Sequence, residues 1–190
     1  MSKRPFVSLT RRDFLRTGAL GVAGLTMAAA SPLAAQQVGL ETELVSAWDV
    51  TLNPPQVVGP TPDGLRQIIM VEGGTASGPK INGTWLPGGG DWLRVRSDGV
   101  FVLDVRGTLQ LDDESLAFVH YPGYAVTSPE VFNRITSGEE VDGSEYYFRV
   151  TPRFETASEQ YGWLNSAIFV GVGRIGPFLA SVHYDVYQIL

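Results

Sequence analysis

Short runs of alternating apolar and polar residues dominate the chain from residue 40 onward, and a period of two is typical of half-buried β-strands. The runs predict strands over residues 40–50, 66–72, 82–85, 92–96, 100–110, 115–121, 145–154, 163–172 and 178–189. Turn chemistry separates them, and Asn82-Gly83 and Asp98-Gly99 are hairpin signals. One short helix is predicted over residues 128–135, because Ser128 can cap it and Pro129 suits its first turn.

Many short, turn-linked strands with a single helix predict an all-β protein. We expect a single antiparallel β-barrel of about eight strands with one short helix, and a sandwich is the alternative. The barrel is favoured because closure removes exposed strand edges. The chain has no cysteine, so its fold rests on its core and not on disulfides.

The first 35 residues have the layout of a secretory signal, with a basic start, an uncharged middle and small residues at the end. Within them the segment TRRDFLR places Arg11-Arg12 before Phe14-Leu15, which resembles the twin-arginine export motif of bacteria. Residues 1–35 are therefore predicted to be a twin-arginine signal peptide, and residues 36–190 a single barrel domain. Cleavage after Ala30 or Ala35 fits the small-residue rule, and Ala35 is preferred. We expect export by the twin-arginine machinery to the periplasm or the medium.

The net charge of the chain excludes some classes of partner. The whole chain has a formal net charge of −6, from 14 Lys and Arg against 20 Asp and Glu, and five of the basic residues lie in the predicted signal. The rest of the chain is more acidic, so it lacks the basic surface that nucleic-acid binding requires. It also lacks a basic amphipathic stretch for a membrane surface, so no stable membrane insertion is expected after signal removal. A small-molecule ligand is the expected partner, and no feature indicates an oligomeric state.

The run Gly88-Gly89-Gly90 stands before Asp91 and Trp92. A phosphate-binding loop would end in Lys-Ser or Lys-Thr and enter a helix, whereas this run enters a predicted strand. The glycines therefore supply backbone freedom, either for a tight turn or to let a ligand approach. In the second case Asp91 and Trp92 would lie beside the ligand.

Polar side chains recur on one face of three predicted strands. They are Asp104 and Arg106 on the first, Arg149 and Glu155 on the second, and Tyr161, Trp163 and Asn165 on the third. Surface ion pairs and ordinary aromatic packing are one explanation. The other is that this face points into the barrel and lines a pocket for a small polar or aromatic ligand.

Three segments carry a family resemblance: GPKINGTWLPGGGDWLRVRSDGVFVLDVRGTLQLDD, YFRVTPRFETASEQYGWLN and the closing YDVYQIL. Together they resemble the family called domain of unknown function 3237, over roughly residues 40–190. The resemblance implies a compact antiparallel β-barrel of unassigned biochemical role, and some members are associated with small-molecule metabolism. This sequence departs from the family at Glu114, which follows Asp113 where glycine is expected, so a differently built turn is predicted there.

The available side chains favour acid/base chemistry without a cofactor. His120 and His183 are the only histidines and neither lies in a metal-binding motif, so no metal site is predicted; His120 fits a core histidine or a ligand contact. No nucleophile motif is present either.

Isomerases and lyases that act beside a carbonyl need only an acid/base group and hydrogen-bond donors. The candidate catalytic residues are Asp91, Arg106, Glu155 and Tyr161. The candidate ligand-binding residues are Trp92, Asp104, Arg149, Trp163, Asn165 and His120. A non-catalytic periplasmic binding protein and a purely structural barrel are the alternatives. A cavity that gathers an acid, an arginine and a tyrosine would favour the enzyme, and an apolar one with a single polar anchor would favour the binding protein.

Overall fold

The computed structural model describes residues 39–190. Residues 1–38 lie outside this range, so the predicted signal peptide, its cleavage site and the boundary at residue 36 are outside it too. The described chain forms one compact unit, Gly39–Leu190. In this part of the chain no helix has the length and the apolar character needed to cross a membrane.

Twelve strand segments form one continuous antiparallel sheet. They are β1 (Thr42–Leu52), β2 (Gln56–Thr61), β3 (Gly64–Ser77), β4 (Gly83–Trp85), β5 (Gly90–Asp91), β6 (Arg94–Val95), β7 (Phe101–Leu111), β8 (Leu116–Val126), β9 (Tyr147–Val150), β10 (Arg153–Thr156), β11 (Ile168–Ile175) and β12 (Ser181–Ile189). One α-helix, α1 (Pro129–Thr136), follows β8. Three short 3₁₀ helices complete the described elements: η2 (Gly143–Glu145), η3 (Gly162–Ser166) and η4 (Pro177–Leu179).

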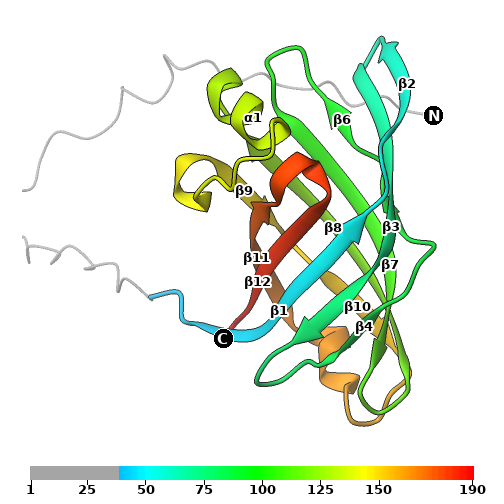
Figure 1. Ribbon diagram of the computed structural model, residues 1–190. Helices are drawn as coiled ribbons and strands as arrows, with labels where there is room; N and C mark the ends of the chain where they lie inside the picture. The colour runs from blue at the N-terminus through cyan, green and yellow to red at the C-terminus, as the bar shows by residue number, and fades with distance from the viewer. Residues whose placement is uncertain (1–38) are drawn as a thin grey trace, which may run out of the picture. The chain divides into compact units, whose positions relative to one another are not determined.

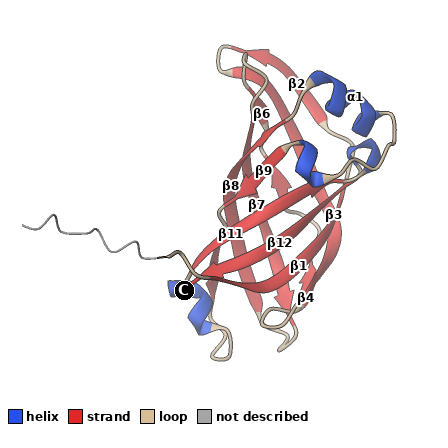
Figure 2. Ribbon diagram, turned by 90° about the vertical axis from the view of Figure 1, so that its left-hand side faces the viewer, coloured by secondary structure: helices blue, strands red, loops and turns tan. Residues whose placement is uncertain are grey.

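The sheet closes into an eight-strand barrel, as the sequence predicts. The order runs β3–β1–β12–β11–β9–β8–β7, and the short strands β4, β5 and β6 bridge β7 back to β3. The successive segments β9 and β10 both pair with β8 and share one barrel position. Figures 1 and 2 show α1 and the β2 hairpin at one end of this barrel and η3 at the other.

Most predicted elements are confirmed with shifted ends. The helix begins at Pro129, and the side chain of Ser128 accepts a hydrogen bond from the Val131 N–H at 3.1 Å, as a cap should. The strand β2 was not expected, because its Gly59 and Pro60 read as turn residues. The predicted strand over residues 145–154 is two strands, β9 and β10, which follow η2. The predicted strand over residues 163–172 is wrong in its first half. Residues 162–166 form η3 there, and the Leu164 N–H donates to the Tyr161 carbonyl at 3.0 Å.

The turn at Glu114 contains a left-handed residue, a conformation that glycine adopts without strain. Glu114 has a φ of 66°, in the left-handed region that side chains disfavour. Asp113 supports this turn through its side chain, which accepts hydrogen bonds from the Ser115 N–H at 3.0 Å and the Ser115 hydroxyl at 2.5 Å. Glu114 therefore takes a strained conformation in this turn.

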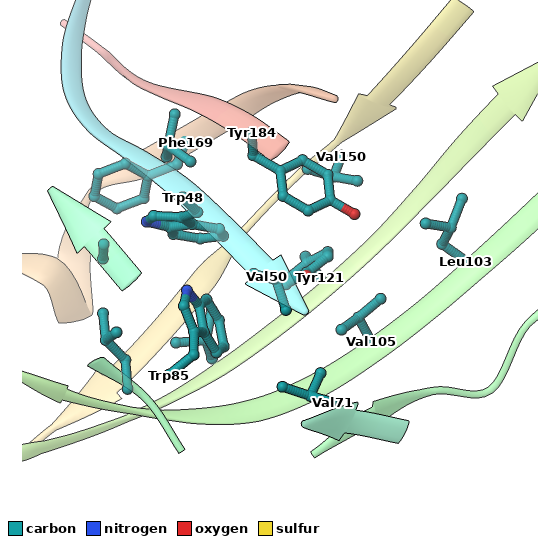
Figure 3. Packing of buried hydrophobic residues seen from close by; sticks show 14 of the residues in the cluster. Trp48, Val50, Val71, Trp85, Leu103, Val105, Tyr121, Val150, Phe169 and Tyr184 are labelled. Carbon is teal, nitrogen blue, oxygen red and sulfur yellow. The ribbon is translucent and has the colours of Figure 1, made fainter. Parts of the chain in front are cut away.

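A cluster of aromatic side chains fills the barrel interior toward the η3 end: Trp48, Trp85, Phe154 and Phe169. The rings of Trp48 and Trp85 meet edge to face at 5.0 Å, and both residues are almost fully buried. Gly107 makes room for this packing, because a Cβ there would come within 2.9 Å of the Trp85 ring. In Figure 3, Tyr121 and Tyr184 lie between the two tryptophans and Leu103.

Candidate functional site

A cavity of about 340 Å³ occupies the barrel interior at the α1 end. Its walls are apolar side chains of the barrel, among them Val50, Ile69 and Leu103. Phe132 of α1 and Leu179 of η4 cover it, and the ring of Phe132 packs against Phe101 at 5.5 Å. The volume and the apolar lining are typical of a site for a small organic molecule.

Asp91 is the only charged residue among those that line this cavity. It lies on β5, between Ile69 of β3 and Val105 of β7, which also line the cavity. The preceding glycines bring it there: Gly88 has a φ of 104°, and a Cβ on Gly89 would come within 2.6 Å of the Arg106 carbonyl oxygen. The glycine run therefore serves both a turn and a close strand contact, and these place Asp91 in the barrel.

The interior raises the pKa of Asp91 to about 7. Burial is the main cause, because it removes water from the charged form, and the negative charge of Asp104 adds to it. Two interactions oppose this increase: the main-chain N–H of Asp104 donates to Asp91 Oδ1 at 3.0 Å, and Arg66 contributes a positive charge. Asp91 therefore exchanges a proton near neutral pH.

Tyr121 and Tyr184 contribute two phenol groups to the same cavity. They lie on β8 and β12, and their rings meet edge to face at 5.5 Å. Burial raises the pKa of both, and the charge of Asp91 raises each further, so both phenols stay protonated at neutral pH. Figure 3 shows the hydroxyl of Tyr184 directed away from Trp48. Asp91, the two phenols and the amide of Gln67 thus form the polar part of an otherwise apolar cavity.

Of the residues singled out from the sequence, Asp91 alone lines the cavity. The expected polar inner face of β7 is its outer face, because Leu103, Val105 and Leu109 are the buried residues of this strand. Asp104 and Arg106 therefore form an exposed ion pair, with Arg106 Nη2 and Asp104 Oδ2 3.1 Å apart.

Two more predicted residues, His120 and Trp92, join this outer group. His120 Nε2 lies 3.1 Å from Asp104 Oδ1, and the Arg106 guanidinium lies 5.3 Å from the Trp92 ring centre.

The remaining predicted residues lie elsewhere. Arg149 and Glu155 are exposed on the outside of the barrel, next to inward-facing Phe148 and Phe154. Tyr161 is buried, but its hydroxyl donates to Asp112 Oδ1 at 2.5 Å and not into the cavity. Trp163 and Asn165 lie on η3, at the opposite end from α1 (Figure 2). The structure therefore does not gather the predicted acid, arginine and tyrosine in one place.

Sequence reasoning missed Tyr121 and Tyr184 because it looked for polar faces. Both tyrosines lie in apolar alternations, Ala117-Val119-Tyr121 on β8 and Tyr184-Val186 on β12, which are typical of inward-facing strand residues. A search for hydroxyl groups on the apolar faces would have found them. Among the described residues, no group of three or more His, Cys, Asp or Glu side chains could hold a metal ion.

These features define a small closed antiparallel β-barrel with a mainly apolar internal cavity and one acid in the cavity wall. Residues 40–189 match the family described as protein of unknown function DUF3237, and the chain belongs to this family. A UPF0311 protein of Clostridium acetobutylicum is 38% identical over 129 residues, which cover 67% of this chain and 82% of that protein.

Solved structures show the same barrel. A conserved protein of unknown function from Rhodopseudomonas palustris is 32% identical, with a TM-score of 0.75, over 80% of this chain and 99% of its own. A β-barrel-like protein from Acinetobacter baumannii is 37% identical, with a TM-score of 0.68, over 80% of this chain and 97% of its own. An enzyme from Penicillium herquei is 19% identical with a TM-score of 0.57, over 80% of this chain and 95% of its own, and that likeness concerns the fold alone.

Proposed function

We propose that the barrel binds a small, mainly apolar organic molecule in its cavity, with a polar group of the ligand beside Asp91. The observation that carries this proposal is the single carboxylate in a mainly apolar wall, whose other polar side chains are Gln67, Tyr121 and Tyr184. Such a wall favours an apolar ligand body, and one polar anchor fixes its orientation. A purely structural barrel has no need for an empty interior, since side chains can fill a barrel of eight strands.

We further propose that the bound molecule undergoes acid/base chemistry without a cofactor, of the isomerase or lyase type. The pKa of Asp91, about 7, supports this, because a general base works best when its pKa lies near the working pH. Arg106, Glu155 and Tyr161 have no part in it, since they lie outside the cavity. Non-catalytic binding of the same ligand is the alternative, and the two share one site.

Thermal-shift screening against neutral aromatic and carbonyl-bearing compounds tests the binding proposal. We expect a hit to raise the melting temperature of the wild type and to do so less in Asp91→Asn. Glu72→Gln is the matched control, because Glu72 is an exposed carboxylate on β3, the strand beside Asp91. A hit that shifts wild type and Asp91→Asn equally would contradict the role of Asp91. The absence of any hit among compounds that fit 340 Å³ would contradict binding.

Export by the twin-arginine route remains a proposal that rests on residues 1–35. Fusion of these residues to a reporter that fluoresces only when it folds before export tests it directly. We expect reporter in the periplasm or the medium, and its retention in the cytoplasm when Arg11 and Arg12 are both replaced by lysine. A reporter that stays in the cytoplasm without these changes would overturn the proposal.

A further inference from the structure

We propose that the cavity takes an uncharged ketone with a removable hydrogen on the carbon next to the carbonyl, and that Asp91 moves this hydrogen while the phenols hold the ketone oxygen. This inference rests on the proposed function, because it requires a ligand in the cavity. It names the substrate class and the roles of Asp91, Tyr121 and Tyr184. Three features of the site support it.

The first feature is the charge of the wall. Asp91 lines the cavity, and no lysine, arginine or histidine does. A bound carboxylate, phosphate or sulfate would lose its water, find no cation and meet a like charge, and each of these effects is unfavourable. The wall therefore selects against anionic ligands and admits a neutral apolar body.

The second feature is the way in which the protein holds Asp91. The Asp104 N–H donates to Oδ1, and this is the one hydrogen bond to the Asp91 carboxylate within residues 39–190. The main chain of β7 thus fixes the carboxylate from the wall side and leaves Oδ2 without a partner there. An anchored carboxylate with one free oxygen is suited to accept a proton from a ligand in the cavity.

The third feature is the presence of two protonated phenols in the same cavity as this base. Asp91 comes from β5, whereas Tyr121 and Tyr184 come from β8 and β12, and all three line the same cavity. A phenol O–H can donate to a ketone oxygen and stabilise the negative charge that grows on it as the hydrogen leaves. A site with a base and such donors can enolise a ketone without a metal ion or a cofactor.

The chemical step balances with the groups present. Asp91 Oδ2 takes the hydrogen as a proton, the C–H electron pair forms a carbon–carbon double bond, and the carbonyl electron pair moves to the oxygen, which a phenol O–H stabilises. The protonated Asp91 then returns the proton to the same carbon or, in a ketone with a neighbouring double bond, to the far end of the conjugated system. The second outcome moves the double bond, so the product is an isomer and Asp91 is regenerated.

Hydrogen exchange into a ketone tests this step without knowledge of the natural substrate. The probe is 2-tetralone, a bicyclic ketone with acidic hydrogens, and its uptake of deuterium from D₂O is followed by NMR. We expect wild type to accelerate exchange above the buffer rate, Asp91→Asn to lose about a hundredfold of this acceleration, and Tyr184→Phe to lose about tenfold. Tyr124→Phe and Glu72→Gln should behave like wild type, because both residues are exposed on the outside of the barrel.

Binding measured alongside exchange separates this inference from the proposed function. The same calorimetric titration is made with 2-tetralone, with 2-naphthoate as the anionic relative and with 2-aminotetralin as the cationic one. Binding of 2-tetralone without accelerated exchange would overturn proton transfer and leave the binding function in place. Tighter binding of 2-naphthoate would overturn the substrate class, and so would tighter binding of 2-aminotetralin. Failure of all three to bind would overturn both proposals.

Discussion

Asp91 and Asp104 are joined through the barrel wall by a hydrogen bond from the Asp104 main-chain N–H to Asp91 Oδ1, 3.0 Å long. The side chain of Asp91 faces the cavity, whereas that of Asp104 is exposed outside beside Arg106 and His120. The outer charge group therefore lies directly behind the inner acid, and the charge of Asp104 contributes to its raised pKa. Removing that charge should lower the pKa of Asp91, as carboxyl NMR of Asp104→Asn would show.

The raised pKa of Asp91 predicts a dependence of stability on pH. Its pKa is about 7 in the folded protein and 3.8 for an unperturbed aspartate, which represents the unfolded chain. The folded state therefore holds this proton more tightly. The stability that Asp91 contributes is therefore complete below the unfolded pKa and is lost as pH rises toward 7. Besides burial, the groups that set this titration are Asp104 on β7 and Arg66 on β3.

Asp91→Asn should remove most of this dependence. Urea unfolding should show that the wild type loses unfolding free energy between about pH 5 and about pH 8. The variant should lose about 2–4 kcal/mol less over the same interval. The comparison uses the difference between the two proteins, because other groups also titrate. Equal losses in wild type and variant would mean that Asp91 is ionised at both pH values.

Replacing alanine by phenylalanine should have different effects on stability at two positions of β8, because only one of them lines the cavity. Ala117 and Ala125 are both buried on the inner face, but only Ala125 lines the cavity. Ala125→Phe should fold with a change in unfolding free energy of about 1 kcal/mol or less and should abolish ligand binding. Ala117→Phe should cost about 1–3 kcal/mol or more, because a packed interior has no space for the ring. Similar destabilisation at both positions would mean that the cavity is closed in solution.

The outer ion pair should contribute little to stability. Arg106 and Asp104 have side chains that are 44% and 41% exposed, and exposed pairs of this kind are worth about 0–1 kcal/mol. Arg106→Ala should therefore change the unfolding free energy by less than about 1 kcal/mol and leave ligand affinity unchanged. Loss of binding in this variant would restore the polar outer face as a functional candidate.

The turn at Glu114 predicts a stabilising substitution. Its φ of 66° is unfavourable for a side chain and free for glycine. Glu114→Gly should raise the free energy of unfolding by about 0.5 kcal/mol, and the melting temperature slightly with it. The gain is small because the larger conformational entropy of glycine in the unfolded chain offsets part of the relieved backbone strain. Glu114→Ala is the control, because it removes the charge and keeps the strain. An equal gain in both variants would assign the effect to charge.

The backbone at Gly138 predicts a destabilising substitution. Gly138 follows α1 with a φ of 95°, in the left-handed region that side chains disfavour. A Cβ there would also meet the ring of Phe178, but this ring is 68% exposed and can turn aside. Gly138→Ala should therefore cost about 1–3 kcal/mol in thermal unfolding through backbone strain and leave ligand binding unchanged. The double variant Gly138→Ala with Phe178→Ala should keep this loss, and its full recovery would assign the loss to the ring contact instead.

The sequence predicted the architecture well because strand alternation and turn residues are local signals. Ser128 and Pro129 located the helix, and the alternation along residues 100–110 correctly separated two faces of β7. Which face points inward is not a local property. Asp104 and Arg106 were candidates for the interior, and the apolar partners Leu103 and Val105 occupy it instead.

The candidate site was predicted only at Asp91. The glycine run drew attention to this residue, and the structure explains it by the turn at Gly88 and the close contact at Gly89. Tyr121 and Tyr184 are separated from Asp91 along the chain. The pairing of β5, β7 and β8 brings Tyr121 to the cavity, and barrel closure brings Tyr184 of β12 there. That juxtaposition depends on the register of several strands, which a single sequence does not reveal.

A crystal structure of the protein with 2-tetralone would show directly whether the cavity holds a ketone between Asp91 and the phenols. We predict the bicyclic body inside the cavity under Phe132 and Leu179, with its ketone oxygen within hydrogen-bond distance of the Tyr121 or Tyr184 hydroxyl and the adjoining carbon facing Asp91 Oδ2. A ligand bound on the outer surface beside Arg106, or one inside the barrel with its oxygen turned away from all three groups, would contradict the account.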